Sequence, residues 1–249
     1  MKIAFLGTAC AEPTAENGYT SFLLEVGGRL VLVDASGNPV QAILRAGRDP
    51  MSLDAVVLTH YHADHVGGFP SLLQTLGCLG RRNDLTIICS KTTEHHVRAF
   101  TDAIDIHPDD IGFGFPFCDG LDDGLLQVSL MDGMHSVPSS MVLLEDDDGK
   151  LFYTSDTEYN PSVALAAHGC RCLIHEATFS HRHLGAPGTR GHSSAYQAGQ
   201  TASAAGVESL LLCHYCARKH DGTDALLEEA RSAFSGDVLI PVNSVWYTV

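Results

Sequence analysis

The sequence predicts an α/β protein in which two packed β-sheets carry helices on their outer faces. Short apolar runs bounded by Gly, Pro, Asn or Asp recur along the whole chain and are typical of strands. Segments with helix-start signals alternate with these runs, in a similar order in both halves. No linker separates the halves, so we expect a single domain over residues 1–249.

In the first half, the apolar runs predict strands at residues 2–7, 19–26, 29–34, 54–59 and 85–89. A helix should follow Asn38-Pro39, because Asn caps helices and Pro suits their first turn. Two more helices are expected, one beyond the strand 54–59 that includes residues 69–73 and one around 92–104. Residues 106–124 are rich in Gly, Pro and Asp and predict a loop with little regular structure.

The second half repeats this pattern. Strands are expected at residues 125–131, 139–145, 150–154, 171–175, 208–213 and 237–240. Helices are expected at residues 161–168, 193–205 and 223–234. The run Asp147-Asp148-Gly149 marks a hairpin between two of the strands.

Composition favours a cytoplasmic enzyme. The 249 residues suffice for a full core, and no apolar run reaches the roughly 18–20 residues that cross a bilayer. The opening segment 1–7 is too short for a signal-peptide core, so the eight cysteines are expected to be reduced thiols. The net charge of −15 disfavours broad nucleic-acid binding, although a local basic patch stays open.

A dense group of metal-binding side chains follows the apolar run 54–58. The motif H-x-H-x-D-H places His60, His62, Asp64 and His65 within six positions. Extended backbone would aim His60 and His62 to the same side, and the next two residues lie where the chain turns. Imidazole and carboxylate ligands suit zinc and similar divalent ions. This motif therefore predicts a metal site.

Three later positions can complete a site for two ions. His135, Asp156 and His214 each follow an expected strand, where a side chain leaves the core. Each one alone could be a buried histidine or a turn aspartate. Zinc fits the histidine-rich set, whereas manganese or iron would use much the same atoms. Asp34, at the end of strand 29–34, is expected to hydrogen-bond to a ligand histidine.

These residues resemble the metallo-β-lactamase superfamily, whose fold is a four-layer αββα sandwich with metals between the sheets at one edge. The resemblance implies that two ions share a hydroxide nucleophile. It assigns His60, His62 and His135 to one ion, assigns Asp64, His65 and His214 to the second, and makes Asp156 the bridge. Asp64 would also orient the hydroxide.

Further motifs resemble ribonuclease Z and its small phosphodiesterase relatives. They are the opening segment 5–14, His175-Glu176-Ala177-Thr178-Phe179, Gly191-His192-Ser193-Ser194 and the segment 213–218. The resemblance implies that His192 acts on the leaving oxygen or the scissile phosphate and that Glu176 holds it. The alternatives are that His192 merely precedes helix 193–205 and that Glu176 forms a structural ion pair. Arg218 could steady a phosphate or lie on the surface.

One departure bears on the substrate. The tRNA endonuclease inserts a long arm between the positions of His135 and Asp156, whereas only twenty residues separate them here. With the acidic charge, this favours a small phosphodiester or nucleotide substrate over nucleic acid. The alternatives are tRNA 3′ processing, hydrolysis of an ester, thioester or lactone, and a non-catalytic metal-binding sensor. A homodimer stays open, and no membrane partner is expected.

Overall fold

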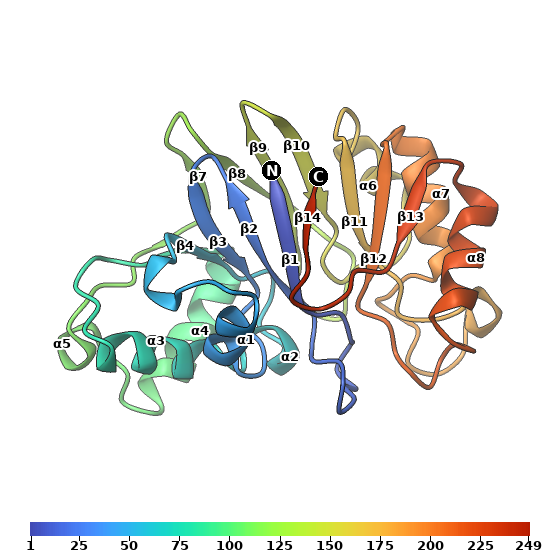
Figure 1. Ribbon diagram of the computed structural model, residues 1–249. Helices are drawn as coiled ribbons and strands as arrows, with labels where there is room; N and C mark the ends of the chain where they lie inside the picture. Colours follow the sequence, from blue (N-terminus) through green and yellow to red (C-terminus); the bar gives the residue numbers. More distant parts are fainter.

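Two seven-stranded sheets face each other in the computed structural model, which describes all of residues 1–249 (Figure 1). The first sheet has the order β14 (Trp246–Thr248), β1 (Lys2–Gly7), β2 (Ser21–Val26), β3 (Arg29–Val33), β4 (Ala55–Val57), β5 (Thr86–Ile88), β6 (Phe117–Cys118). The second has the order β13 (Asp237–Leu239), β12 (Ser209–Cys213), β11 (Cys172–Glu176), β10 (Gly149–Tyr153), β9 (Ser140–Asp146), β8 (Gln127–Asp132), β7 (Gly120–Asp122).

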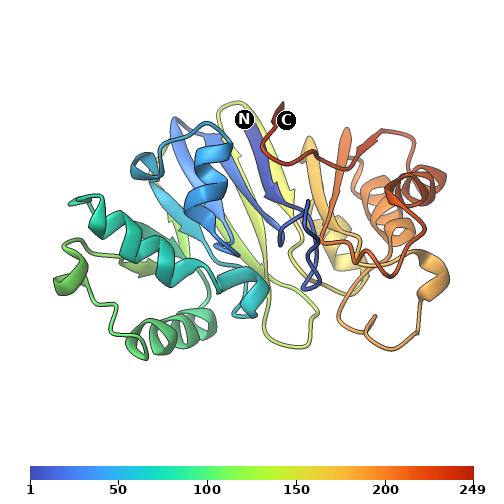
Figure 2. The same cartoon turned by 60° about the horizontal axis from the view of Figure 1, so that its bottom comes forward.

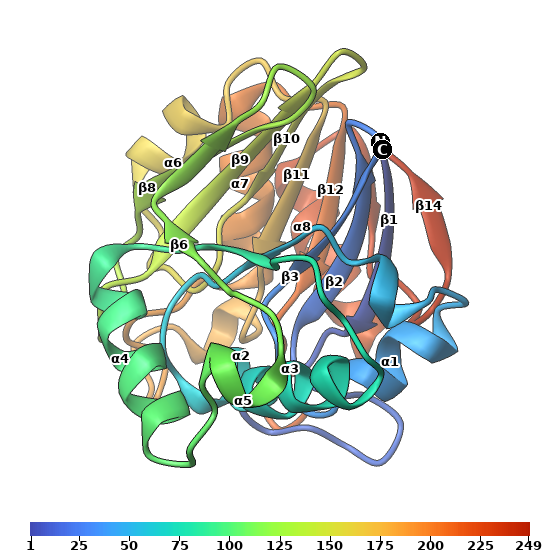
Figure 3. The same ribbon diagram turned by 90° about the vertical axis from the view of Figure 1, so that its left-hand side faces the viewer.

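Helices cover the outer face of each sheet, which confirms the predicted αββα sandwich. On the first sheet lie α1 (Pro39–Arg45), α2 (Ala63–Val66), α3 (Phe69–Cys78), α4 (Lys91–Asp102) and α5 (Pro108–Ile111). Figure 3 views this layer from outside. On the second sheet lie α6 (Pro161–Ala166), α7 (Ala195–Ala205) and α8 (Thr223–Ala233). No helix is both long and apolar enough to cross a bilayer.

Three apolar layers hold the sandwich together. Strand side chains alternate between faces, so Phe5 points between the sheets while its neighbour Ala4 points toward the helices. Between the sheets, the rings of Phe22 and Tyr153 meet edge to face with centroids 5.0 Å apart. Because strands are buried on both faces, they appear in the sequence as continuous apolar runs.

The strands that lead into the candidate residues end at the same edge, the lower one in Figure 1. Within the first sheet, β3 and β4 are parallel, and within the second, β10, β11 and β12 are parallel. Three residues at these ends have left-handed backbone, namely Asp34 (φ 57°), Ser155 (φ 50°) and His214 (φ 55°). Such conformations cost of order 1–3 kcal/mol each, so strain gathers where the chain turns into this edge.

The segment 106–124 corrects one prediction. Expected as a loop, it forms α5 and two edge strands, β6 on the first sheet and β7 on the second. These strands are only two and three residues long and lie among Gly, Pro and Asp. They are too short to show the alternation of apolar and polar residues that predicts a strand. The C-terminal strand β14, which pairs with β1, was also not predicted. The single-domain assignment stays a prediction.

Candidate metal centre

The seven predicted ligand residues lie together at the edge where the strands end, which Figure 2 turns toward the viewer. His60 and His62 follow β4, and Asp64 and His65 belong to the short helix α2. The rest come from the second sheet, with His135 after β8, Asp156 after β10 and His214 after β12. We call these seven residues the His/Asp cluster.

The first group of the cluster has three imidazole nitrogens facing one point. His62 Nδ1 lies 3.1 Å from His60 Nε2 and 3.2 Å from His135 Nε2. In the second group, Asp64 Oδ2 lies 3.5 Å from His214 Nε2 and 3.7 Å from His65 Nε2. Ligand atoms of one metal ion have this mutual spacing.

Asp156 lies between the two groups. Its Oδ2 is 3.8 Å from both His60 Nε2 and His135 Nε2 in the first group. The same oxygen is 3.5 Å from His65 Nε2 and 3.2 Å from His214 Nε2 in the second. A single buried carboxylate oxygen therefore reaches both groups, as a bridging ligand must.

Unpartnered buried atoms show that this donor set fits divalent ions. His65 Nε2, His214 Nε2 and Asp156 Oδ1 are buried without a hydrogen-bond partner. Native proteins seldom leave buried polar atoms unsatisfied unless they serve a ligand or a reaction. Burial also lowers the pKa of His60 well below its usual value, which keeps the imidazole neutral and able to donate its lone pair.

Hydrogen bonds to the other ring nitrogen orient most of the histidines. In four of the five histidines, Nδ1 contacts an oxygen, so that Nε2 faces the rest of the cluster. The pairs are His65 with Asp34 Oδ2 (2.8 Å), His60 with Thr59 Oγ1 (3.1 Å), His214 with Thr178 Oγ1 (3.0 Å) and His135 with Gly191 O (2.7 Å). Asp34 also accepts hydrogen bonds from the backbone and hydroxyl of Thr59. Asp34 thus orients His65 directly and His60 through Thr59.

Replacing Asp34 should weaken metal binding. We expect Asp34→Asn to lower metal affinity about 10- to 100-fold, because the amide no longer provides the charge that orients His65. Asn keeps the side-chain size and tolerates the left-handed backbone. Competition with a chromogenic chelator measures the affinity. Asp105→Asn is the matched control, because Asp105 is also left-handed (φ 54°) but exposed. Equal affinities in both variants would contradict this role.

The buried Glu176 pairs with the partly buried His192 beside the cluster. His192 Nδ1 lies 3.0 Å from Glu176 Oε1, so Nε2 is the nitrogen left for a substrate. Glu176 is held by the backbone N–H of Thr157 and the hydroxyl of Thr178. Burial lowers the pKa of His192, but the charge and hydrogen bond of Glu176 outweigh it and raise that pKa to about 9. His192 also lies close enough to Asp156 and His214 to be a further ligand.

A hollow of about 400 Å³ opens onto the cluster, and we call it the metal-side hollow. Arg190 and Lys219 line it, although sequence reasoning singled out neither. Both lie in loops without periodic pattern, and only their positive charge near His192 and His214 could have signalled them. Arg218 does not line this hollow; it is exposed and forms an ion pair with Glu12.

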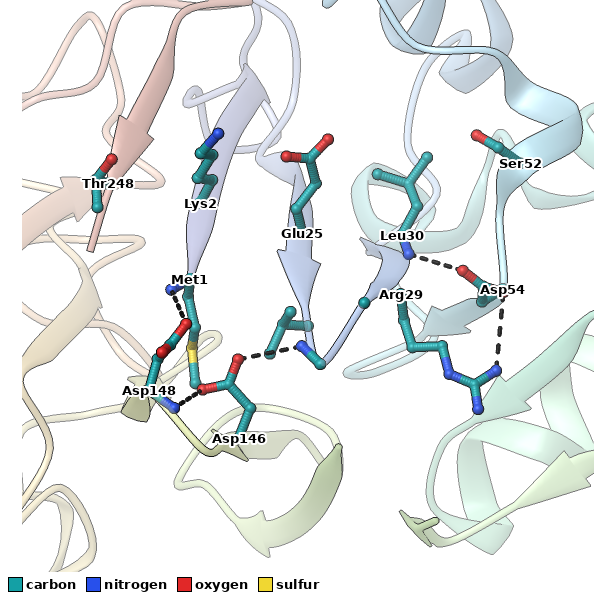
Figure 4. Close-up of a pocket in the computed structure, with 13 residues that line it drawn as sticks. Met1, Lys2, Glu25, Arg29, Leu30, Ser52, Asp54, Asp146, Asp148 and Thr248 are labelled. Atoms are coloured by element: carbon teal, nitrogen blue, oxygen red, sulfur yellow. Dashed lines mark hydrogen bonds and ion pairs between the residues drawn. The ribbon is translucent and has the colours of Figure 1, made fainter. Parts of the chain in front are cut away.

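A different hollow, of about 600 Å³, lies at the opposite end of the sandwich (Figure 4). It is acidic, but its carboxylates are already engaged. Asp146 accepts hydrogen bonds from the N–H groups of Gly27 and Asp148, and Asp54 accepts one from Leu30. We therefore place the candidate active site in the metal-side hollow. All eight cysteines are free thiols.

Facing sheets with a His/Asp cluster at one shared edge define the class of metal-dependent hydrolases with the metallo-β-lactamase fold. Comparison with known families agrees with this class, because residues 29–215 match the model described as "Beta-lactamase superfamily domain". The chain belongs to this family, and it is a metal-dependent hydrolase.

Three relatives illustrate the relationship. The chain is 26% identical over 297 residues to a ribonuclease Z of Halorubrum lacusprofundi, covering 97% of this chain and 94% of the relative. The metallo-beta-lactamase fold protein YhfI from Bacillus subtilis superposes with a TM-score of 0.84 at 25% identity, covering 99% and 98% of the two chains. The short form of human tRNase Z superposes with a TM-score of 0.79 at 18% identity, covering 100% and 99%. The last likeness concerns the fold alone.

Proposed function

We propose that this chain is a phosphodiesterase of the ribonuclease Z type, which cleaves RNA near its 3′ end with two divalent ions held by the His/Asp cluster. The expected metal is zinc. The observation that carries the proposal is the Glu176–His192 pair at the edge of a cluster bridged by Asp156. Full-length relatives named ribonuclease Z favour RNA as the substrate.

In this proposal the chain's own residues orient the attacking water and donate a proton to the leaving group. Ions bound by the cluster would supply an activated water and polarise the phosphoryl oxygens. Asp64, which lines the metal-side hollow, orients the attacking water. His192 donates a proton from Nε2 to the departing alkoxide, since an alkoxide is a poor leaving group without one. Glu176 is a positioning residue that keeps His192 protonated and fixed.

A small phosphodiester is the second candidate substrate. The segment between His135 and Asp156 is filled by the β9–β10 hairpin, whose strands are joined by a two-residue turn. It therefore has no room for a long arm. The alignment with the Halorubrum relative also runs over 297 residues, whereas this chain has 249, so the relative carries segments that this chain lacks.

A substrate panel on metal-loaded protein tests the proposal. Zinc-, manganese- and iron-loaded samples are assayed on a precursor tRNA with a 3′ trailer, 2′,3′-cyclic nucleotides, bis(p-nitrophenyl) phosphate, and ester, thioester and lactone substrates. We expect trailer cleavage with kcat/KM at least tenfold above that for the small diesters. The reverse order would favour the second candidate. Turnover of acyl substrates alone would exclude a phosphodiesterase, and no turnover would favour a sensor module.

A further inference from the structure

A second hollow, of about 850 Å³, adjoins the metal-side hollow. Three residues line both hollows: His135, Ser136 and Arg190. A substrate whose scissile phosphate lies at the cluster can therefore extend past these residues without leaving the protein surface. The second hollow is thus a continuation of the candidate active site.

Apolar side chains form one wall of the second hollow. Met134, Val137 and Pro138 lie in the segment between β8 and β9, on either side of His135 and Ser136. Met134 is 54% exposed, so its side chain is accessible to a ligand in the hollow. A flat aromatic group such as a nucleobase can cover an apolar wall of this kind.

Arg190 is the cation at the junction of the two hollows. Other basic groups in the neighbouring loops are engaged, because Arg182 pairs with Asp221, Arg218 with Glu12, and Lys219 donates to Gly188 O. Arg190 is exposed and takes part in no hydrogen bond or ion pair of the structure. Its guanidinium therefore remains available for a ligand.

Glu158 is the acidic residue that lines the second hollow. Its Oε1 accepts a 2.7 Å hydrogen bond from the backbone N–H of Gly191, so it braces the loop before His192. It forms no ion pair with Arg190, although both residues line the same hollow. A guanidinium at such a junction matches a phosphate group, which accepts two parallel N–H bonds from it.

The geometry points to Arg190 as the residue that binds a second phosphate, next to the scissile one, while the nucleoside between them rests on the Met134 wall. This inference rests on the proposed function and makes it more specific. The substrate class is an oligonucleotide with at least two phosphates, rather than an isolated diester. Arg190 is then a specificity-determining residue of this chain.

Matched dinucleotides test the inference. UpU has one phosphate, whereas pUpU and UpUp each have two. We expect the wild type to hydrolyse one of the two-phosphate substrates with kcat/KM about tenfold above UpU, and Arg190→Gln to bring that ratio close to one. Arg45→Gln is the control, because it removes an exposed positive charge on α1, away from both hollows. A wild-type ratio near one, or an unchanged ratio in Arg190→Gln, would overturn the inference.

Binding separates this inference from the proposed function. A fluorescent trinucleotide in which a methylene group replaces the 3′ bridging oxygen of each internucleotide phosphate, so that the charge stays but the bond cannot be hydrolysed, is titrated by anisotropy into metal-loaded wild type and both variants. We expect about tenfold weaker binding by Arg190→Gln and a salt dependence reduced by about 0.7 in log–log slope. This result without turnover of any diester would reject the phosphodiesterase and keep the nucleotide site. Equal binding by wild type and Arg190→Gln, or no binding by wild type, would reject the site.

Discussion

Asp156→Asn is expected to lower kcat/KM by about 10³-fold or more and to release at least one of two bound ions. The substitution keeps the side-chain volume but removes the negative charge that lies 3.2 Å from His214 Nε2 and 3.5 Å from His65 Nε2. Metal ions contribute several kcal/mol of transition-state stabilisation, and each 1.4 kcal/mol corresponds to a tenfold change in rate. Metal analysis of the purified protein and kcat/KM on the best substrate measure both effects.

A matched control separates this result from a general loss of charge. Asp237→Asn changes an exposed carboxylate at the start of β13, and it should leave metal content and rate unaltered. Circular dichroism with a thermal melt checks that Asp156→Asn still folds. If that variant retained two ions and full activity, Asp156 would not be the bridge, and the two-ion assignment would have to be abandoned.

His192→Ala should have an effect that depends on the leaving group. A general acid contributes 10²- to 10⁴-fold when the departing oxygen is an alkoxide. A p-nitrophenolate leaves without protonation. We therefore expect kcat to fall by about 10²-fold or more on RNA or UpU and less than tenfold on bis(p-nitrophenyl) phosphate. Parallel kinetics on these substrates, with metal content measured for the same samples, give the comparison.

The outcome for His192 also distinguishes its two possible roles. If His192 were a metal ligand together with Asp156 and His214, its loss would lower the metal content and slow the hydrolysis of both substrates alike. As the acid, it must be protonated, so activity falls when the pH rises through its pKa. Glu176→Gln removes the charge that raises this pKa, and the alkaline limb of the pH profile should then move to lower pH. If the alkaline limb stayed at the same pH, Glu176 would not set the pKa of the group that donates the proton.

Much of the architecture was predictable because the strands are buried on both faces. The runs 29–34 and 208–213 each contain four consecutive apolar residues, 30–33 and 210–213, and their bounds match β3 and β12 closely. Helix starts were predictable where a local bond fixes them, as at Asn38, whose side chain accepts a hydrogen bond from the N–H of Gln41. The candidate ligand positions were predicted from the H-x-H-x-D-H motif and from polar side chains directly after apolar runs, and the resemblance to the metallo-β-lactamase superfamily assigned them to two ions.

The remaining features depend on contacts that a sequence does not display. Thr178 binds both Glu176 and His214, yet a threonine carries no signal of its own. Arg190 can be singled out only in the structure, where the other basic side chains in the neighbouring loops form ion pairs or hydrogen bonds. β6 and β7 are short strands at the ends of the two sheets. Tertiary packing, rather than local propensity, decides that they pair there.

The division of the His/Asp cluster between the two sheets has a thermodynamic consequence. His60, His62, Asp64 and His65 belong to the N-terminal sheet, and His135, Asp156 and His214 belong to the C-terminal one. In the proposed assignment each ion takes ligands from both sheets, so the free energy of metal binding would also stabilise the packing of the two halves against each other. Under this assignment, cells short of the metal would contain a less stable protein as well as an inactive one, and degradation would remove the protein when its ions are scarce.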